Sequence, residues 1–158
     1  MKILNTGPEL GSPLSEQEII SFLSNSKLNL HLGTVNERNQ PNIHPIWYYY
    51  DAASDRIYAE TSRHSKKLDN IRKNKTVYFC VDEPNYPKGV KGKGIANVHE
   101  DVADNLKKGK KIWIKYLGSL EHPMALSFHS YMERGESVVL EIIPDYYFAW
   151  DLGKGQKE

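Results

Sequence analysis

Short segments of alternating apolar and polar residues dominate the chain and predict a largely β-structured domain. In L-N-L-H-L-G-T-V, residues 28–35, leucines alternate with polar residues, which indicates a strand with one buried face. Further strand-like segments cover residues 42–50, 56–60, 76–82, 88–100, 137–143 and 146–151, with Pro144 between the last two. Strands at hairpin spacing with few intervening helices predict an antiparallel barrel.

Helical patterns are fewer and stand outside this run of strands. Ser15 precedes Glu18 by three residues, which predicts a capping box, and Leu14 and Ile19 stand at the positions of a hydrophobic staple. Further helices are predicted at about residues 65–73, 102–117 and 123–133. The predicted fold is therefore mainly β with peripheral helices, in a single domain over residues 1–158 whose first 13 residues form an N-terminal arm.

Glycine and proline interrupt two of the predicted strands. Gly92 and Gly94 indicate a bulge, a barrel corner or close approach to a ligand. Pro45 removes a ladder donor and keeps His44 extended, so the strand either leaves its neighbour there to face a ligand or is a plain edge strand. Trp47 either stacks on a ligand ring or fills the barrel.

Composition narrows the class of protein. The 158 residues suit one domain, and a formal charge of +1 gives no global attraction to nucleic acid or to an anionic membrane. The sequence contains neither an apolar run long enough to span a bilayer nor the pattern of a signal peptide. Cys80 is the single cysteine, so no internal disulfide can form. We expect a soluble, cytoplasmic protein with no nucleic-acid or membrane partner.

The stretch Y-A-E-T-S-R-H-S-K-K-L-D-N-I-R-K-N carries the clearest candidate chemistry. It runs from a strand through a polar turn into a basic helix. Hydroxyls and ammonium groups gather there, from Thr61, Ser62, Ser65, Lys66 and Lys67. The helix N-terminus adds free N–H groups and the positive end of the helix dipole, which together suit a phosphate. The alternative is a capped surface helix with solvated lysines.

Other chemistry has weaker support. His44, His64 and His99 occur without His-x-x-x-His or Cys-x-x-Cys spacing, so no metal centre is predicted. Cys80 stands among apolar strand residues and is expected to be inert. The lysines between residues 107 and 115 could contact a polyanion, but such a run is more often a solvated helix face.

The order of these parts resembles the pyridoxamine 5′-phosphate oxidase-like superfamily of flavin-binding split barrels, over about residues 15–151. The most specific part is T-S-R-H-S-K-K-L-D-N-I-R-K-N followed by V-Y-F-C-V. The resemblance implies an antiparallel Greek-key split β-barrel. It also implies a set of cofactor-binding residues: His44, Pro45, Ile46 and Trp47 along the isoalloxazine ring, Thr61, Ser62, Ser65, Lys66 and Lys67 at the phosphate, and Trp150 on the closing strand.

The resemblance implies an FMN-dependent oxidoreductase that acts on a small molecule and is a homodimer with the flavin at the subunit interface. Deazaflavin F420 is an open alternative to FMN, because both share the phosphate and ring sites. The chain lacks the W-x-G-x-x-x-R-L-H-type element of true pyridoxamine phosphate oxidases, which argues against vitamin B6 synthesis. The competing classes are a non-catalytic flavin- or haem-binding module and, with less support, a nucleic-acid-binding barrel.

Overall fold

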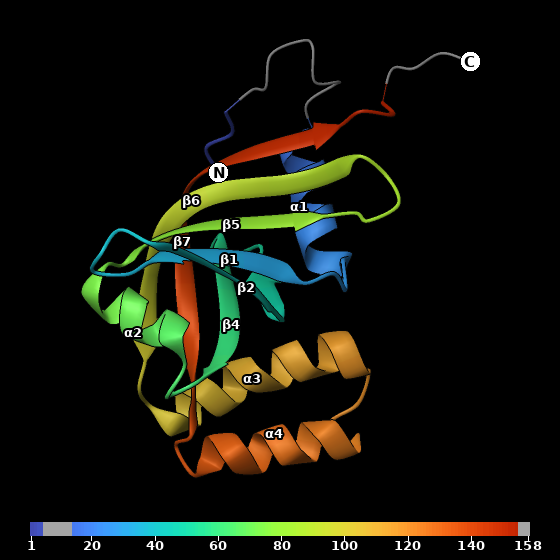
Figure 1. Ribbon diagram of the computed structural model, residues 1–158. Coiled ribbons are helices and arrows are strands. Elements are labelled where there is room, and N and C mark those ends of the chain that lie inside the picture. Colours follow the sequence, from blue (N-terminus) through green and yellow to red (C-terminus); the bar gives the residue numbers. More distant parts are fainter. Residues whose placement is uncertain (5–13, 155–158) are drawn as a thin grey trace.

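The computed structural model describes residues 1–4 and 14–154, so most of the predicted N-terminal arm (residues 5–13) lies outside the described part. Within it, strands form one curled antiparallel sheet with helices around it (Figure 1). The elements are α1 (Glu16–Asn25), β1 (Leu30–Val35), β2 (Pro41–Ile46), β3 (Tyr48–Asp51), β4 (Arg56–Ser62), α2 (Lys66–Lys73), β5 (Thr76–Asp82), β6 (Lys88–His99), α3 (Val102–Leu117), α4 (Pro123–Glu133) and β7 (Ser137–Asp151).

The order of the strands explains why the barrel is split. The 7-stranded sheet runs β2-β1-β5-β6-β7-β4-β3, so β2 and β3 lie at its two opposite edges. In the chain, however, Trp47 alone separates these strands. Ile46 still pairs with Leu30 of β1, whereas Tyr48 pairs with Ala59 of β4. The sheet must therefore curl until its edges meet at Trp47, which confirms the split barrel and divides the predicted strand 42–50 into two.

Strand β4 runs past the end of its partner at this junction. Its pairing with β3 ends at Ala59, while its pairing with β7 continues to Ser62. Beyond Ala59, the edge of β4 that faces β2 thus has no strand paired to it in the described structure. The side chains of β4 alternate, with Ile57, Ala59 and Thr61 buried toward the barrel. This gap between β2 and the end of β4 is called the slot below.

The closing strand is continuous rather than broken at Pro144. Strands β6 and β7 stay paired from Lys88 to His99, with a shift in register between Lys93 and Gly94. The bulge predicted at the glycines is confirmed, and it accommodates Pro144, which lies opposite Gly94. A Cβ on Gly94 would lie 2.5 Å from the carbonyl oxygen of Ile143, so the strands approach too closely there for a side chain.

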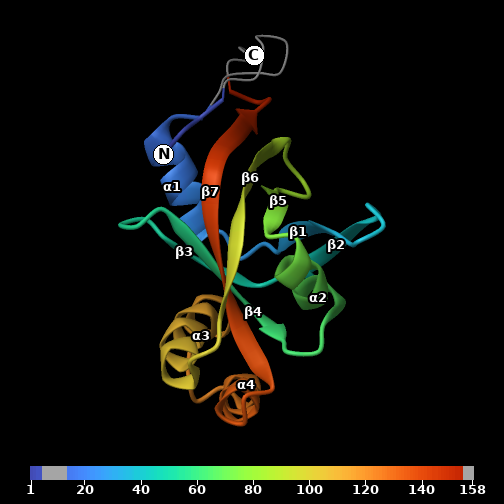
Figure 2. The same cartoon turned by 90° about the vertical axis from the view of Figure 1, so that its left-hand side faces the viewer.

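The helices cover different parts of the barrel. The capping box of α1 is present, because the Ser15 hydroxyl accepts from the N–H of Glu18 and the Glu18 carboxylate accepts from the N–H of Ser15. Helices α3 and α4 pack against each other on the outer side of β4 and β7 (Figure 2), around the fully buried Trp113. No helix of the described part is long and apolar enough to cross a membrane.

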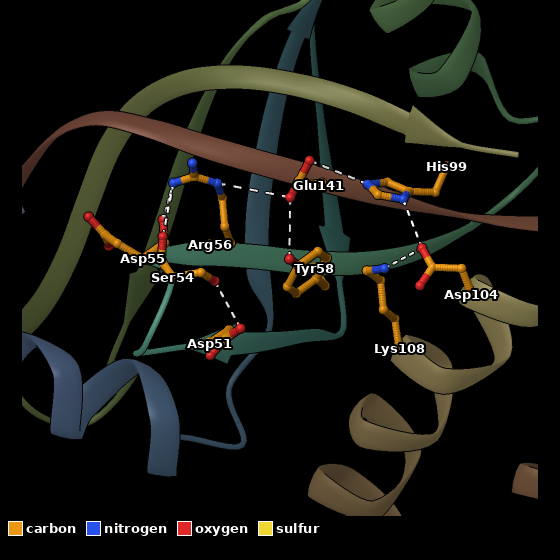
Figure 3. A network of polar contacts seen from close by, with 9 residues as sticks. All are labelled: Asp51, Ser54, Asp55, Arg56, Tyr58, His99, Asp104, Lys108 and Glu141. Atoms are coloured by element: carbon orange, nitrogen blue, oxygen red, sulfur yellow. Dashed lines mark hydrogen bonds and ion pairs between the residues drawn. The ribbon is translucent and has the colours of Figure 1, made fainter. Parts of the chain in front are cut away.

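A polar network fixes α3 against the outer face of the sheet (Figure 3). Glu141 of β7 accepts a hydrogen bond from the Tyr58 hydroxyl at 3.2 Å and lies 3.3 Å from Nε2 of His99. Nδ1 of His99 lies 3.1 Å from the carboxylate of Asp104, which also pairs with Lys108. The first turns of α3 are thereby held over β4, which sets the position of Trp113 further along the helix.

Candidate functional site

A cavity of about 310 Å³ occupies the slot, where the edge of β2 faces the free end of β4 and helices α2, α3 and α4 approach. Its lining comprises His44, Pro45, Ile46, Trp47, Glu60, Thr61, Ser62, Lys67, Ile112, Phe128, Tyr131 and Ser137. The lining thus brings together predicted residues from both sequence segments, the H-P-I-W segment and the T-S-R-H-S-K-K segment. The cavity is open enough to admit a ligand of moderate size.

Lys67 is a buried cation whose recorded hydrogen-bond partner is neutral. The residue is 7% exposed, and its ammonium donates to the hydroxyl of Thr61 at 2.9 Å. That hydroxyl lies 3.0 Å from the hydroxyl of Ser65. No carboxylate of the described residues forms an ion pair with Lys67, and burial lowers the pKa of its ammonium. A buried charge in this state is stabilised by an anion that enters the cavity.

The first turn of α2 adds to the same positive field. Ser65 is the N-cap, and its side chain bonds Thr61 rather than a backbone N–H of the helix. The first N–H groups of a helix have no intrahelical acceptor and carry the positive end of its dipole. Asn70 anchors the helix, because its buried side-chain amide donates to the Thr34 hydroxyl of β1 at 3.0 Å. The turn is thus held in place before any ligand arrives.

The β2 side of the cavity differs from the α2 side. The pKa of His44 is lowered, first by partial burial and second by the charge of Lys67, so the two groups share one electrostatic environment. Pro45 pairs with His31 on an edge strand and contributes no backbone donor. The expectation that the strand leaves its neighbour at Pro45 is wrong, because β2 stays paired with β1 through Ile46. The edge-strand reading is confirmed, and Pro45 lines the slot from that edge.

Trp47 lines the cavity from the junction between β2 and β3. Its ring stacks on Tyr116 of α3, with centroids 4.6 Å apart and an angle of 3° between the planes. It meets Phe128 of α4 edge-on at 6.1 Å. The indole therefore lies outside the barrel core, where it forms part of an aromatic wall between the sheet and the two helices.

Glu60 is a cavity residue that the sequence analysis did not single out. Its Oε2 accepts from the indole Nε1–H of Trp113 at 2.7 Å, and its Oε1 accepts from the hydroxyl of Ser137 at 2.8 Å. Burial raises the pKa of the carboxyl, and these two hydrogen bonds oppose that shift. Its sequence position carried little signal, because Glu60 follows Ala59 at an outward-facing position of the strand's alternation.

Ser62 lines the cavity at the end of β4 that faces α4. Its hydroxyl lies 3.5 Å from the Tyr131 hydroxyl of α4 and accepts from the N–H of His64. Tyr131 and Phe128 enter the lining from α4, one of the two helices after Glu100 that were expected to shape the substrate pocket. Which side chains of α4 contribute could not be read from its sequence, because that depends on how the α3–α4 pair folds back onto β4.

Three predicted site residues do not line the slot cavity. Ser65 takes part through its contact with Thr61 rather than as a wall of the cavity. Lys66 points to a separate hollow beside the β1–β2 turn, which it lines with Arg38 and Gln40. Trp150 is near the far end of β7, where a Cβ on Gly89 would be 2.4 Å from its ring, and it does not line the slot cavity.

A second hollow of about 330 Å³ lies on the outer surface of β1, β2 and β5–β7. Ile43 is 70% exposed and Tyr78 is 55% exposed there, beside Tyr146 and Phe148. We call this surface the outer apolar face. Large exposed side chains gathered in this way are typical of an interaction surface.

Among residues 1–4 and 14–154, no group of three or more His, Cys, Asp or Glu side chains is arranged to hold a metal ion. The lining of the slot combines the buried ammonium of Lys67, the aromatic wall at Trp47 and the partly buried carboxyl of Glu60.

Several solved structures share the fold. A conserved hypothetical protein from Mycobacterium tuberculosis is 26% identical, with a TM-score of 0.75 and 92% of this chain matched to 91% of that one. An F420 reductase is 22% identical at a TM-score of 0.62, over 80% of this chain and 94% of its own. A FAD-binding protein from Mesorhizobium loti is 21% identical at a TM-score of 0.62, over 87% and 95%.

No curated protein matches the chain. The model of the pyridoxamine 5′-phosphate oxidase family, in contrast, matches residues 15–151, which span every strand and helix described above. The split barrel and the family match agree in extent. The chain belongs to the pyridoxamine 5′-phosphate oxidase family.

Proposed function

We propose that the chain is an FMN-binding oxidoreductase that transfers two electrons between its flavin and a small-molecule substrate. The observation that carries the proposal is Lys67, a buried ammonium that lines a cavity and has a neutral hydrogen-bond partner. A phosphate monoester would supply the missing negative charge. Family membership and the flavin- or F420-related names of structural neighbours support the same class of cofactor.

The donors around Lys67 suit a terminal phosphate. The Lys67 ammonium and the Thr61 hydroxyl line one end of the slot, and the Ser65 hydroxyl at the start of α2 contacts Thr61 behind them. In this proposal Lys67 neutralises the phosphate, and Thr61 orients the ammonium. Asn70 keeps the turn in place through its bond to Thr34.

The rest of the slot suits a flat ring. FMN, when bound, supplies the hydride-transfer chemistry. The chain contributes an apolar edge from Pro45 and Ile46, the aromatic wall at Trp47, and the free edge of β4 beyond Ala59. These groups would position the ring and keep water from one side of it.

F420 is the competing cofactor, and one observation favours it: a structural neighbour is named as an F420 reductase. At 22% identity that likeness concerns the fold. FMN is preferred here because its phosphate is terminal, and the Lys67 end of the slot offers several donors to a single group.

The test is a titration of the purified chain with FMN and, separately, with F420, monitored by flavin or deazaflavin fluorescence. We expect saturable quenching with FMN. Mass spectrometry of the small molecules released on denaturation identifies the cofactor that the protein carries from its host. Saturable binding of F420 alone would identify F420 as the cofactor in place of FMN. The absence of a saturable change with either ligand would overturn the proposal. If the bound flavin accepted electrons from no reductant, the chain would be a non-catalytic binding module.

We also propose that the chain is a homodimer that joins through the outer apolar face. The aromatic strand 47–50 is covered by this chain's own helices and core, whereas Tyr146 and Phe148 remain on the outer surface. Light scattering at micromolar concentration should give twice the monomer mass. Ile43→Asp should yield a folded monomer, while Leu126→Asp, at an exposed leucine of α4 outside that face, should stay dimeric. A monomeric wild-type protein would contradict the proposal.

A further inference from the structure

The hydrogen bonds of Glu60 leave part of its carboxylate available to a ligand. An ionised carboxylate has about four acceptor sites. Trp113 and Ser137 occupy one site on each oxygen, and both of these donors are neutral. No Lys, Arg or His of the described residues forms an ion pair with Glu60. The carboxyl lines the slot cavity, so its remaining acceptor sites can be reached from there.

A structural role alone does not explain an ionisable group at this position. A glutamine has the same shape and would make both hydrogen bonds, with its carbonyl accepting from Trp113 and its amide donating to Ser137. It would do so without the cost of burying a charge. The carboxyl therefore adds one property that the fold does not need, which is a negative charge held inside a ligand-sized cavity.

Aromatic side chains line the same cavity as this carboxylate. Phe128 and Tyr131 of α4 and Trp47 line the same cavity, and the Phe128 ring lies 6.4 Å from that of Trp113. Aromatic faces attract organic cations, and flat apolar walls favour a planar ligand body. A buried carboxylate beside aromatic faces is suited to an organic ammonium group.

We propose that Glu60 and the aromatic side chains beside it form a subsite for the ammonium group of an amine substrate carried on a flat apolar body. Glu60 forms the charged contact, and Phe128 and Tyr131 contact the apolar body. Lys67 does not compete for Glu60, because its ammonium is bonded to Thr61, which lies on the other face of β4. The inference deepens the proposed function by naming a substrate class, and its use in turnover rests on that function.

The experiment compares two probes of the same shape, benzylamine and benzyl alcohol, by isothermal titration calorimetry of the purified chain with and without saturating FMN. We expect benzylamine to bind at least about 10-fold more tightly, from one charge-assisted hydrogen bond. Equal affinities in both conditions would overturn the proposal.

Variants locate the preference. Glu60→Gln retains the shape and both hydrogen bonds, so it should abolish the preference for benzylamine while FMN affinity changes less than about 3-fold. Glu133→Gln removes an equal charge from an exposed site on α4 and should retain the preference. A preference that survives in Glu60→Gln would show that the cation binds elsewhere, and would overturn the proposal.

The pH profile provides a second readout that does not depend on a variant. An alkylammonium stays protonated through the neutral and acidic range, so benzylamine affinity should fall as pH falls through the pKa of Glu60. The other titratable groups of the lining are His44, Lys67 and Tyr131, and all three remain in Glu60→Gln. The pH-dependent change in benzylamine affinity that is lost in Glu60→Gln therefore belongs to Glu60. If the variant does not fold, a flat wild-type preference across the acidic range would overturn the proposal.

The outcomes separate this inference from the proposed function. Retained FMN binding without a preference for benzylamine would refute the subsite and leave the flavin assignment intact. A Glu60-dependent preference in a chain that does not bind FMN would support the subsite and refute the flavin assignment. Lys67→Ala should weaken FMN binding. It should keep the preference for benzylamine, because Glu60 stays in place and only a cation is removed from the cavity.

Discussion

Two charges of opposite sign, one buried and one partly buried, flank the end of β4 and are held in similar ways. Lys67 donates to Thr61, and Glu60 accepts from Trp113 and Ser137, so each charge has neutral partners. Glu60 and Thr61 are successive residues whose side chains leave opposite faces of the strand. The free edge of β4 lets one cavity reach both faces. The end of a single strand therefore holds a cation on one face and a carboxylate on the other, at the same cavity.

The two ends differ in how far apart their partners lie in the chain. Lys67 and Thr61 are 6 residues apart, within one strand–turn–helix unit. Glu60 is 53 residues from Trp113 and 77 from Ser137. The first end depends on local structure, and the second on how α3 and α4 pack against the sheet. If the proposed roles hold, substrate preference can change through those helices while the Lys67 end stays the same.

The largest effect is expected when the positive charge of Lys67 is removed. Lys67→Ala should weaken FMN about 10-fold or more, through loss of one charge-assisted contact. Riboflavin, which lacks the phosphate, should lose much less, and fluorescence titration measures both ligands. Lys66→Ala is the matched control, because its side chain points to another hollow. Equal weakening of FMN and riboflavin by Lys67→Ala would mean that Lys67 supports the fold or the ring rather than the phosphate.

An intermediate effect should follow from loosening the turn that presents this charge. Asn70→Ala leaves the buried Thr34 hydroxyl without its donor and should cost about 1–3 kcal/mol of unfolding free energy, measured by urea denaturation. Asn74→Ala, at the exposed end of the same helix, should cost less. FMN affinity should fall with Asn70→Ala more than with Asn74→Ala. Similar losses in both variants would argue that Asn70 does not position α2.

A smaller effect is expected at a third charge, the partly buried ammonium of Lys115. Lys115 donates to the Leu23 carbonyl and lies over the Tyr48 ring, away from the slot, and burial lowers the pKa of its ammonium to about 7. Between that pKa and its unfolded value, the unfolded chain binds more protons, so stability should rise with pH. Above pH about 10 the trend should end, since tyrosines ionise in the unfolded chain while Tyr48 and Tyr116, whose pKa values are raised by burial, do not.

Replacement of this lysine isolates its contribution. Lys115→Met should flatten the rise above pH 7 and increase stability at lower pH by about 1–2 kcal/mol, since part of the side chain stays hydrated. Lys111→Met, on the exposed side of α3, should preserve the pH dependence. Thermal melts across this range provide the measurement. A pH profile of Lys115→Met identical to that of wild type would show that its ammonium is not desolvated.

Local patterns predicted most elements of the fold. The bounds of α3, α4 and β5 match the predicted ranges, because each has a clear periodicity and a clear start or stop. The two errors in the strands were of another kind. The division at Trp47 and the continuity through Pro144 follow from which distant strands pair, and neither can be read from a window of neighbouring residues.

The candidate site divides in the same way. The structure brings His44, Pro45, Thr61 and Lys67 to one cavity, as the two motifs together suggested, although their role in cofactor binding remains a prediction. Glu60 was passed over because a single glutamate in a strand is usually solvated. Its burial depends on Trp113, and that contact exists because of the α3–α4 hairpin.

The one-residue junction at Trp47 also restricts how this chain can evolve. Because β2 and β3 belong to opposite edges of the sheet, an insertion or deletion of one residue here would shift β3 by one position against β4. Tyr48 and Tyr50, now buried, would turn outward, and Tyr49 would turn into the barrel. The length of this junction should therefore be invariant among functional descendants, while the connection that carries α3 and α4 is free to lengthen, shorten or be replaced.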